Sequence, residues 1–175
     1  MKRSIGASSL LGFSVTALGG TILHFLYEWL GESPCVAPFS GVNESTWEHM
    51  KLLFWPMLAF AVFERIFFPR EEVFWCVKLR AILLGLSMIP LIFYVYNGVI
   101  GKSPDFINIA IFFISAAVAY IYEFRARKAK DTPCGAPRIA LSLLFCLAAL
   151  FIIFTFFTPQ IEIFRDPLTG KFGIL

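Results

Sequence analysis

Long runs of apolar residues separated by short polar connections dominate this sequence. A hydrocarbon core about 30 Å thick is crossed by about 20 apolar residues of helix. Five segments reach that length and predict transmembrane helices at residues 5–30, 45–68, 72–98, 105–127 and 137–159. Pro56 and Pro90 fall inside the second and third of these segments. Each proline removes a backbone donor, which predicts a local kink in those two helices.

Composition supports a membrane location. Of the 175 residues, 58% are hydrophobic and 15% are charged, whereas soluble domains have about half apolar and about a quarter charged residues. The mean hydropathy is +0.76. We therefore predict an all-α integral membrane bundle, one transmembrane domain over residues 1–175, with an outer tail at 160–175. The apolar N-terminus has no clear cleavage site before His24, so we expect this segment to be retained.

Lysine and arginine are unevenly distributed among the connections, and this bias predicts orientation. The connection at 31–44 has no Lys or Arg, and the connection between the third and fourth segments has only Lys102. The other side collects Lys2, Arg3, Arg65, Arg70, Lys78, Arg80, Arg125, Arg127, Lys128, Lys130 and Arg138. We predict a multipass protein of the cell membrane with its N-terminus inside and its C-terminus outside. Glu64 and Glu123 are interpreted as anchoring charges at the inner ends.

The residue pattern argues against nucleic-acid binding and against a disulfide framework. The basic residues lie at helix ends and form no basic face, which argues against nucleic-acid binding. The four cysteines, Cys35, Cys76, Cys134 and Cys146, show no C-x-x-C spacing. No disulfide framework is expected, and Cys76 and Cys146 are interpreted as buried thiols in apolar segments. The oligomeric state does not follow from the sequence.

Polar residues of the first two segments gather near their outer ends. His24 and Glu28 are four residues apart and share one helix face, and His49 lies at a similar depth in the next segment. Ionisable groups inside spanning helices are functional candidates by default. Imidazoles and carboxylates together form a mixed ligand set that suits zinc, iron or manganese. His24, Glu28 and His49 are therefore the candidate ligands of a divalent metal.

A metal at this position would support hydrolysis of a lipid-linked or amphipathic small-molecule substrate at the outer leaflet of the lipid bilayer. The metal would hold a water molecule, and Glu44 or Glu48 would take its proton. Arg165, in the outer tail, would orient an anionic group of the substrate. Glu44, Glu48 and Arg165 are thus the candidate catalytic residues of a membrane-embedded hydrolase.

Other interpretations of the same residues stay open, and enzyme activity is undecided. Ser45 and Glu48 match a capping box at a helix start. Lys51 can neutralise Glu44, Glu48 or Glu28 in a buried ion network that needs no metal, and Arg165 can pair with Asp166 in an exposed turn. A non-catalytic membrane component with a structural ion network, or a carrier coupled to a cation or proton, is an alternative explanation of the cluster, and the carrier is disfavoured because the five segments show no inverted repeat.

Three strings carry a resemblance to a known family. They are H-F-L-Y-E-W at 24–29, V-N-E-S-T-W-E-H-M-K-L-L-F-W-P at 42–56 and F-R-D-P-L-T-G at 164–170. Together they resemble a family of small bacterial multipass membrane proteins of unknown function. The resemblance covers nearly the whole chain and implies that the three strings act as one unit. It implies no catalytic residue.

Overall fold

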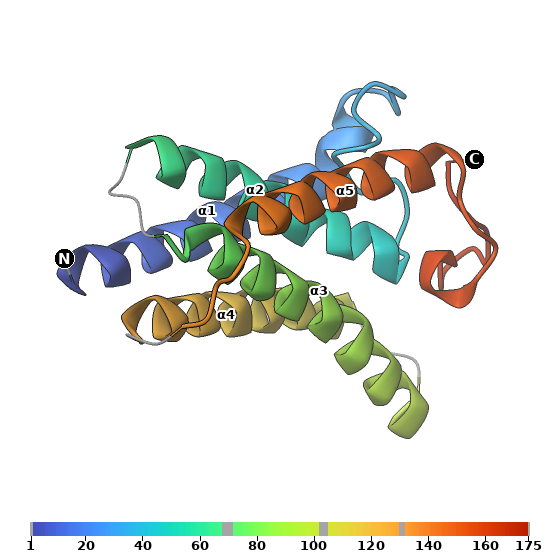
Figure 1. Ribbon diagram of the computed structural model, residues 1–175. Coiled ribbons are helices and arrows are strands. Elements are labelled where there is room, and N and C mark those ends of the chain that lie inside the picture. Colours follow the sequence, from blue (N-terminus) through green and yellow to red (C-terminus); the bar gives the residue numbers. More distant parts are fainter. Residues whose placement is uncertain (1, 68–71, 102–104, 130–131, 175) are drawn as a thin grey trace.

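The chain folds into an all-α bundle, as the hydrophobic pattern predicts. A computed structural model describes residues 2–67, 72–101, 105–129 and 132–174 (Figure 1). Within these ranges there are no strands, and the helices are α1 (Lys2–Trp29), α2 (Thr46–Phe67), α3 (Phe74–Val99), α4 (Asp105–Lys128), α5 (Pro137–Phe156) and the short 3-10 helix η1 (Glu162–Phe164). Pro56 and Pro90 lie inside α2 and α3 without ending either helix. The kinks at these prolines stay a prediction.

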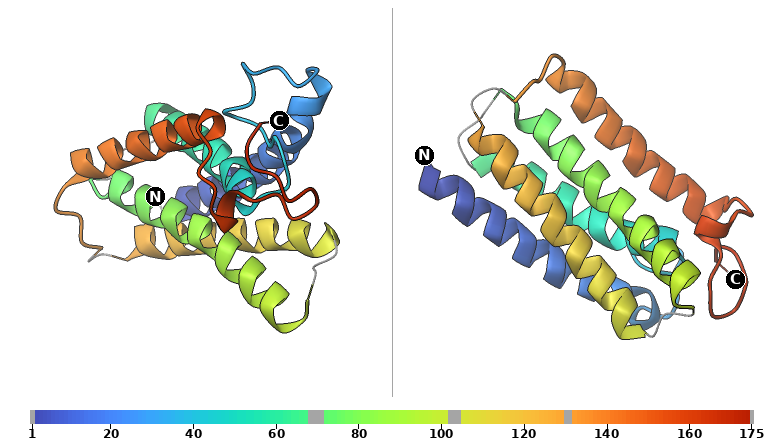
Figure 2. Two further views of the ribbon diagram at one scale, coloured as in Figure 1. Left: turned by 90° about the vertical axis from the view of Figure 1, so that its right-hand side faces the viewer. Right: turned by 90° about the horizontal axis from the view of Figure 1, so that it is seen from below.

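The five long helices lie side by side with alternating directions. Seen from below, α1, α4, α3 and α5 follow one another across the bundle, with α2 behind them (Figure 2). α2 packs against α1 and α3, while α4 joins α1 to α3. We call the end with the start of α1 and the last turns of α2 and α4 the basic end. The opposite end, which carries the connection at 30–45 and the residues after α5, is the tail end.

Four helices, α1, α3, α4 and α5, are long and apolar enough to cross a membrane. α2 carries four charged residues, Glu48, Lys51, Glu64 and Arg65. It is nevertheless a central helix, because its Leu53, Phe54 and Ala61 are completely enclosed. A helix that is surrounded by other helices can bury charged groups against protein instead of lipid. The neighbouring helices turn large apolar side chains such as Leu10, Leu91 and Ile114 outward.

Small residues allow α1 to approach its neighbours closely, as is common between membrane helices. A Cβ atom at Gly20 would lie 2.9 Å from the backbone oxygen of Leu52 and would press on the Phe112 ring. We expect Gly20→Ala to destabilise the bundle by about 1–3 kcal/mol, because the backbone of α2 must move. Unfolding in detergent measures the change. Gly98→Ala is the control, since nothing lies within 4 Å of its Cβ position, and equal losses would contradict close packing at Gly20.

A buried ion network occupies the basic end and corrects the interpretation of Glu64 and Glu123 as rim charges. Lys78 Nζ lies 2.7 Å from Glu64 Oε2 and 2.6 Å from Glu123 Oε1. Arg127 contacts both carboxylates, at 3.1 Å from Glu123. Ser8 donates a hydrogen bond of 2.7 Å to Glu64. The four charged side chains are at most 4% exposed, so the network connects α1, α2, α3 and α4 inside the protein.

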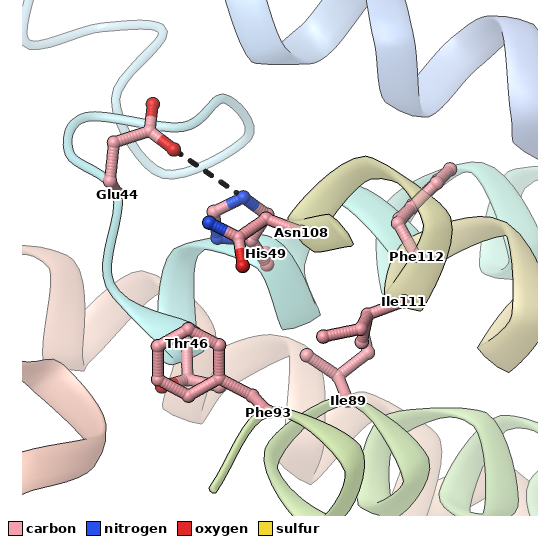
Figure 3. Close-up of a pocket in the computed structure, with 8 residues that line it drawn as sticks. All are labelled: Glu44, Thr46, His49, Ile89, Phe93, Asn108, Ile111 and Phe112. Atoms are coloured by element: carbon pink, nitrogen blue, oxygen red, sulfur yellow. Dashed lines mark ion pairs between the residues drawn. The ribbon is translucent and has the colours of Figure 1, made fainter. Parts of the chain in front are cut away.

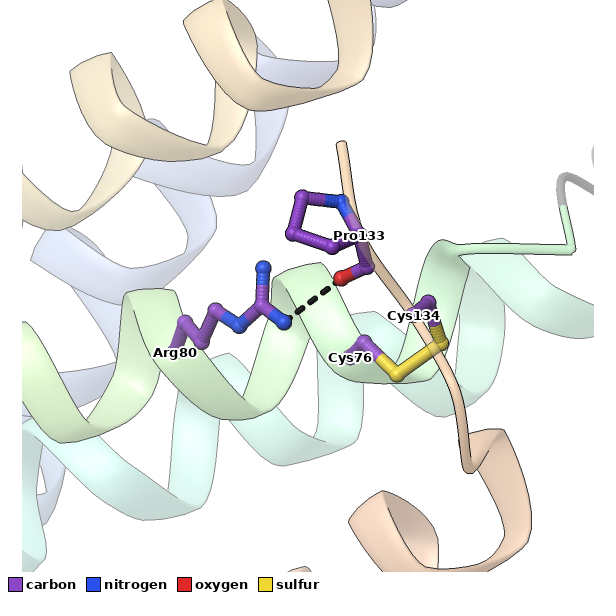
Figure 4. Close-up of a disulfide and its surroundings, with 4 residues drawn as sticks. All are labelled: Cys76, Arg80, Pro133 and Cys134. Atoms are coloured by element: carbon purple, nitrogen blue, oxygen red, sulfur yellow. Dashed lines mark hydrogen bonds between the residues drawn. A yellow bond between two sulfur atoms is a disulfide. The ribbon is translucent and has the colours of Figure 1, made fainter. Parts of the chain in front are cut away.

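A disulfide ties the α4–α5 connection to the start of α3 (Figure 4). Cys76 is bonded to Cys134, with 5.8 Å between their Cα atoms, and Arg80 donates a hydrogen bond of 2.6 Å to the Pro133 oxygen beside it. The interpretation of Cys76 as a free thiol is therefore wrong, because a partner 58 residues away leaves no local spacing motif. Cys146, predicted to be buried, is free and exposed on α5.

Candidate functional site

One carboxylate joins the two histidines of the chain at the tail end. Glu44 Oε1 lies 3.7 Å from His24 Nε2, and Glu44 Oε2 lies 3.5 Å from His49 Nε2. The imidazole centroids are 5.9 Å apart. α1 supplies His24, α2 supplies His49 and the connection between them supplies Glu44. We call these three residues the His–Glu cluster. Its assembly agrees with the expectation that α1 and α2 bring both histidines to one place.

The start of α2 orients His49. Asn43 Oδ1 accepts the Ser45 backbone N–H at 2.9 Å, and Ser45 Oγ accepts the Glu48 N–H at 3.3 Å. Ser45 Oγ thus caps the helix, as the capping-box pattern predicts. The reciprocal bond from the Glu48 carboxylate to the Ser45 N–H is not made, because Asn43 accepts that N–H. His49 Nδ1 lies 3.0 Å from the Ser45 carbonyl oxygen. With Nδ1–H donating to that oxygen, neutral His49 presents a lone pair at Nε2, and protonated His49 donates to Glu44.

Glu48 points away from the cluster into a second buried ion pair. Its Oε2 lies 2.6 Å from Lys51 Nζ and accepts the Val42 backbone N–H at 3.0 Å. Lys51 Nζ also donates to the Ala37 oxygen at 2.8 Å and to Thr155 Oγ1 at 3.0 Å. The pair therefore fastens α2 to the connection at 30–45 and to α5. Of the open alternatives for Glu48, pairing with Lys51 describes the contacts of its carboxylate, which does not cap α2. Its role as a general base stays a prediction.

Two cavities flank the His–Glu cluster, and Glu44 lines both. The smaller, of about 10 Å³, lies against α3 and α4 and is also lined by His49, Thr46 and Asn108 (Figure 3). A cavity of this size is close to the minimum for one water molecule. The larger, of about 290 Å³, is lined by His24, Phe25, Tyr27, Glu28, Glu32, Gly41, Val42, Asn43, Glu44 and Ile174. We call the larger cavity the outer pocket.

The outer pocket combines three carboxylates with one imidazole and one amide. Among the described residues that line it there is no Lys or Arg. Glu32 was not anticipated as a pocket residue. A left-handed turn at Gly31 and Glu32, with φ of 64° and 58°, follows α1 and returns the chain over the helix end. A Gly directly after a helix signals such a turn, but the sequence does not show which side chain it brings back.

The remaining predicted site residues do not join the His–Glu cluster. Glu28 lines the outer pocket, but within the described ranges it forms no ion pair with either histidine. Arg165 pairs with Glu162 at 3.3 Å in the exposed tail and lines neither cavity. The predicted exposed turn therefore exists, but Glu162 takes the place of Asp166 as partner. Asp166 instead accepts the Leu168 backbone N–H at 2.9 Å.

Metal ligation by His24, Glu28 and His49 is not supported by this arrangement. In the part of the chain that the structure describes, no group of three or more His, Cys, Asp or Glu side chains is placed to hold a metal ion. Ligation would bring each donor to roughly 2 Å from a common centre. The carboxylate that meets both imidazoles belongs to Glu44, which was predicted as a base, whereas Glu28 points into the pocket beside them.

Comparison with known proteins identifies a family but no activity. No curated protein and no solved structure matches the chain. The profile of a family of unknown function matches residues 5–174, which include all three strings that carry the resemblance. The chain therefore belongs to this family of unknown function, DUF6512.

Proposed function

We propose that the protein crosses the membrane five times, with α2 as the fifth span, its N-terminus inside and its C-terminus outside. α2 has 22 residues, which at 1.5 Å per residue is about 33 Å. It also runs alongside four helices that are apolar enough to span. Arg65, Arg80 and Arg125 at the basic end support an inner location. Arg70, Lys102 and Lys130 lie outside the described residues.

On this topology the outer pocket binds a small cation that arrives from outside. The observation that carries this proposal is the lining of the pocket, in which Glu28, Glu32 and Glu44 face one cavity without a basic residue among the described ones. Carboxylates with one sign of charge in a partly enclosed site attract cations. An organic ammonium ion and a metal cation share the required chemistry, and a cavity of about 290 Å³ accommodates either.

The helices are closely packed between the outer pocket and the basic end. This packing favours cation binding in the pocket without transport through the bundle. Thr16 and Tyr120 are buried and hydrogen-bonded to each other at 2.8 Å between α1 and α4. A Cβ atom at Gly12 would lie 2.6 Å from the rings of Phe60 and Tyr120. The helices are therefore in close contact between the two polar ends, which favours a binding site over the alternative of a carrier.

A metal-dependent hydrolase is the second candidate, and one observation favours it. Neighbouring ligands of a tetrahedral zinc ion with Zn–N distances near 2.1 Å are about 3.4 Å apart. The contacts of Glu44 with His24 and His49, at 3.7 and 3.5 Å, are close to that spacing. In the described structure the three side chains do not yet form a metal-holding group, so metal binding would require them to move. In this candidate a lipid-linked or amphipathic substrate would bind in the outer pocket. Elemental analysis of protein purified without chelator distinguishes it, because bound zinc, iron or manganese near one per chain is required.

Calorimetric titration of the purified protein tests cation binding, with zinc chloride, manganese chloride and the diamine putrescine as separate probes. We expect saturable binding of at least one probe and a dissociation constant at least tenfold higher for Glu44→Gln. Glu162→Gln is the matched control, because Glu162 is an exposed acid of the same end that does not line the pocket. Absence of saturable binding for all three probes, or equal weakening by both substitutions, would contradict the proposal.

A further inference from the structure

A third cavity lies at the basic end, on the surface between α1 and α4. It has a volume of about 360 Å³ and is lined by Gly6, Ser9, Leu10, Phe13, Ala117, Tyr120, Ile121 and Phe124. We call it the α1–α4 groove. Gly6 leaves room in it, since a Cβ there would reach only ordinary contact with Phe124, at 3.5 Å. From Gly6 to Phe13 the groove follows α1 for about 10 Å, and its wall is almost entirely apolar.

One cation, Lys128, stands at the end of this groove, and a second, Arg125, lies on the same helix turn. Lys128 Nζ lies 4.3 Å from the centroid of the Phe124 ring, which forms part of the groove wall. Arg125 is exposed on the same last turn of α4. In the described ranges neither side chain forms an ion pair, whereas Arg127 on this turn is turned inward to Glu64 and Glu123. On the last turn of α4, Arg127 therefore belongs to the buried network, whereas Lys128 lies at the groove.

We propose that the α1–α4 groove binds an acyl chain of an anionic phospholipid whose phosphate pairs with Lys128 and Arg125. An apolar groove facing the bilayer removes one chain from the bulk lipid, and basic residues at its end recognise the headgroup. Arginine binds phosphate through two parallel N–H groups, and lysine acts as a point charge. Ser9 is 6% exposed, and its hydroxyl has no partner among the described residues.

Charge decides between a lipid and a second copy of the chain as the occupant. Two copies related by a twofold axis along the membrane normal would bring their basic ends together. Lys128 and Arg125 of one copy would then face the same residues of the other, and like charges at close range are unfavourable. An anionic headgroup neutralises these cations instead. On the proposed topology the groove opens to the cytoplasmic leaflet, where anionic lipids attract basic residues.

Native mass spectrometry of the detergent-solubilised full chain tests this site by titration with dioleoyl phosphatidylglycerol and dioleoyl phosphatidylcholine. These lipids have the same acyl chains and differ in headgroup charge. We expect the first phosphatidylglycerol to bind at least fivefold more tightly than the first phosphatidylcholine. In the double variant Lys128→Gln with Arg125→Gln the ratio should fall below twofold. Arg138→Gln, which removes an exposed cation of the same end outside the groove, should keep the preference.

Filling the groove separates this site from general attraction to the basic end. Ala117→Phe places a ring in the groove and should remove the tight site for phosphatidylglycerol. Ala149→Phe adds the same ring to an exposed position of α5 and should leave it intact. Equal affinities for the two lipids in the unmodified protein would overturn the proposal. So would full retention of the tight site in Ala117→Phe, or a dimer that only Ala117→Phe dissociates.

Discussion

Replacing Lys78 by methionine is expected to destabilise the folded protein by about 3–5 kcal/mol, the usual consequence of removing one partner from a buried ion pair. Lys78 contacts Glu64 at 2.7 Å and Glu123 at 2.6 Å. Its removal leaves two buried carboxylates to be neutralised by Arg127 alone. The nearby ring of Phe74, 5.4 Å from Lys78 Nζ, is uncharged and does not neutralise the two carboxylates.

Unfolding of the purified protein in mixed micelles measures this loss. The double variant Lys78→Met with Glu123→Gln is the informative comparison, because the four charges of the network sum to zero. Removing one acid together with the lysine restores neutrality around Glu64 and Arg127, and we expect at least half of the lost stability to return. Lys171→Met, at an exposed position of the tail, should change little. No recovery in the double variant would show that packing, and not charge balance, makes Lys78 important.

The predictions that succeeded rest on local sequence patterns. Hydrophobic runs located the five long helices to within a few residues, and four of these helices are also long and apolar enough to cross a membrane. The meeting of His24 and His49 followed from the alternation of direction in a short-looped bundle, which brings the end of α1 beside the start of α2. The capping of α2 by Ser45 was also readable, since Ser45 and Glu48 are only three residues apart. Lys51 was expected to neutralise Glu44, Glu48 or Glu28, and the structure selects Glu48, three residues away.

The predictions that failed concern contacts between distant helices. Lys78, Glu64 and Glu123 belong to three helices, and no spacing rule shows that their side chains converge. Long charged side chains near helix ends are expected to reach the membrane surface, so the sequence pattern favoured a rim location. Glu28 was favoured over Glu44 as a partner of His24 because it lies on the same helix face. The turn after α1 and the cap of α2 decided which carboxylate approaches the imidazoles.

The two buried networks are placed at opposite ends of α2, and this explains how so polar a helix stays central. Glu64 joins α2 to α1, α3 and α4 at the basic end. Lys51 joins it to α5 and to the connection at 30–45 at the tail end. Between them, apolar side chains such as Phe54 and Met57 form the core. The Lys51 contacts hold the connection that carries Glu44, so the geometry of the outer pocket depends on a structural ion pair.

Cys76 and Cys134 are expected to be reduced in growing cells and joined only after purification in air. The Lys/Arg asymmetry predicts that the basic end lies in the cytoplasm, where cellular thiols keep cysteines reduced. The disulfide of the folded chain lies at this same end. Acid quenching of cells, blocking of free thiols, reduction and labelling with a polyethylene-glycol maleimide measure the oxidised fraction as a gel shift. A Cys35→Ser, Cys146→Ser background leaves only the two cysteines in question.

The result of this labelling experiment decides the orientation of the bundle. Cys76 and Cys134 stay reduced if the basic end lies in the cytoplasm and can form a disulfide if it lies outside. No shift in quenched cells, and a two-label shift after oxidation of the purified protein, are expected for an inside N-terminus. A two-label shift in quenched cells would place the basic end outside and would move the outer pocket to the cytoplasmic side.

Closing a loop of 58 residues corresponds to about 4 kcal/mol in the chain-entropy treatment of a free chain. Helices already held in a bilayer have less entropy to lose, so reduction of the purified protein should lower its stability by less than this.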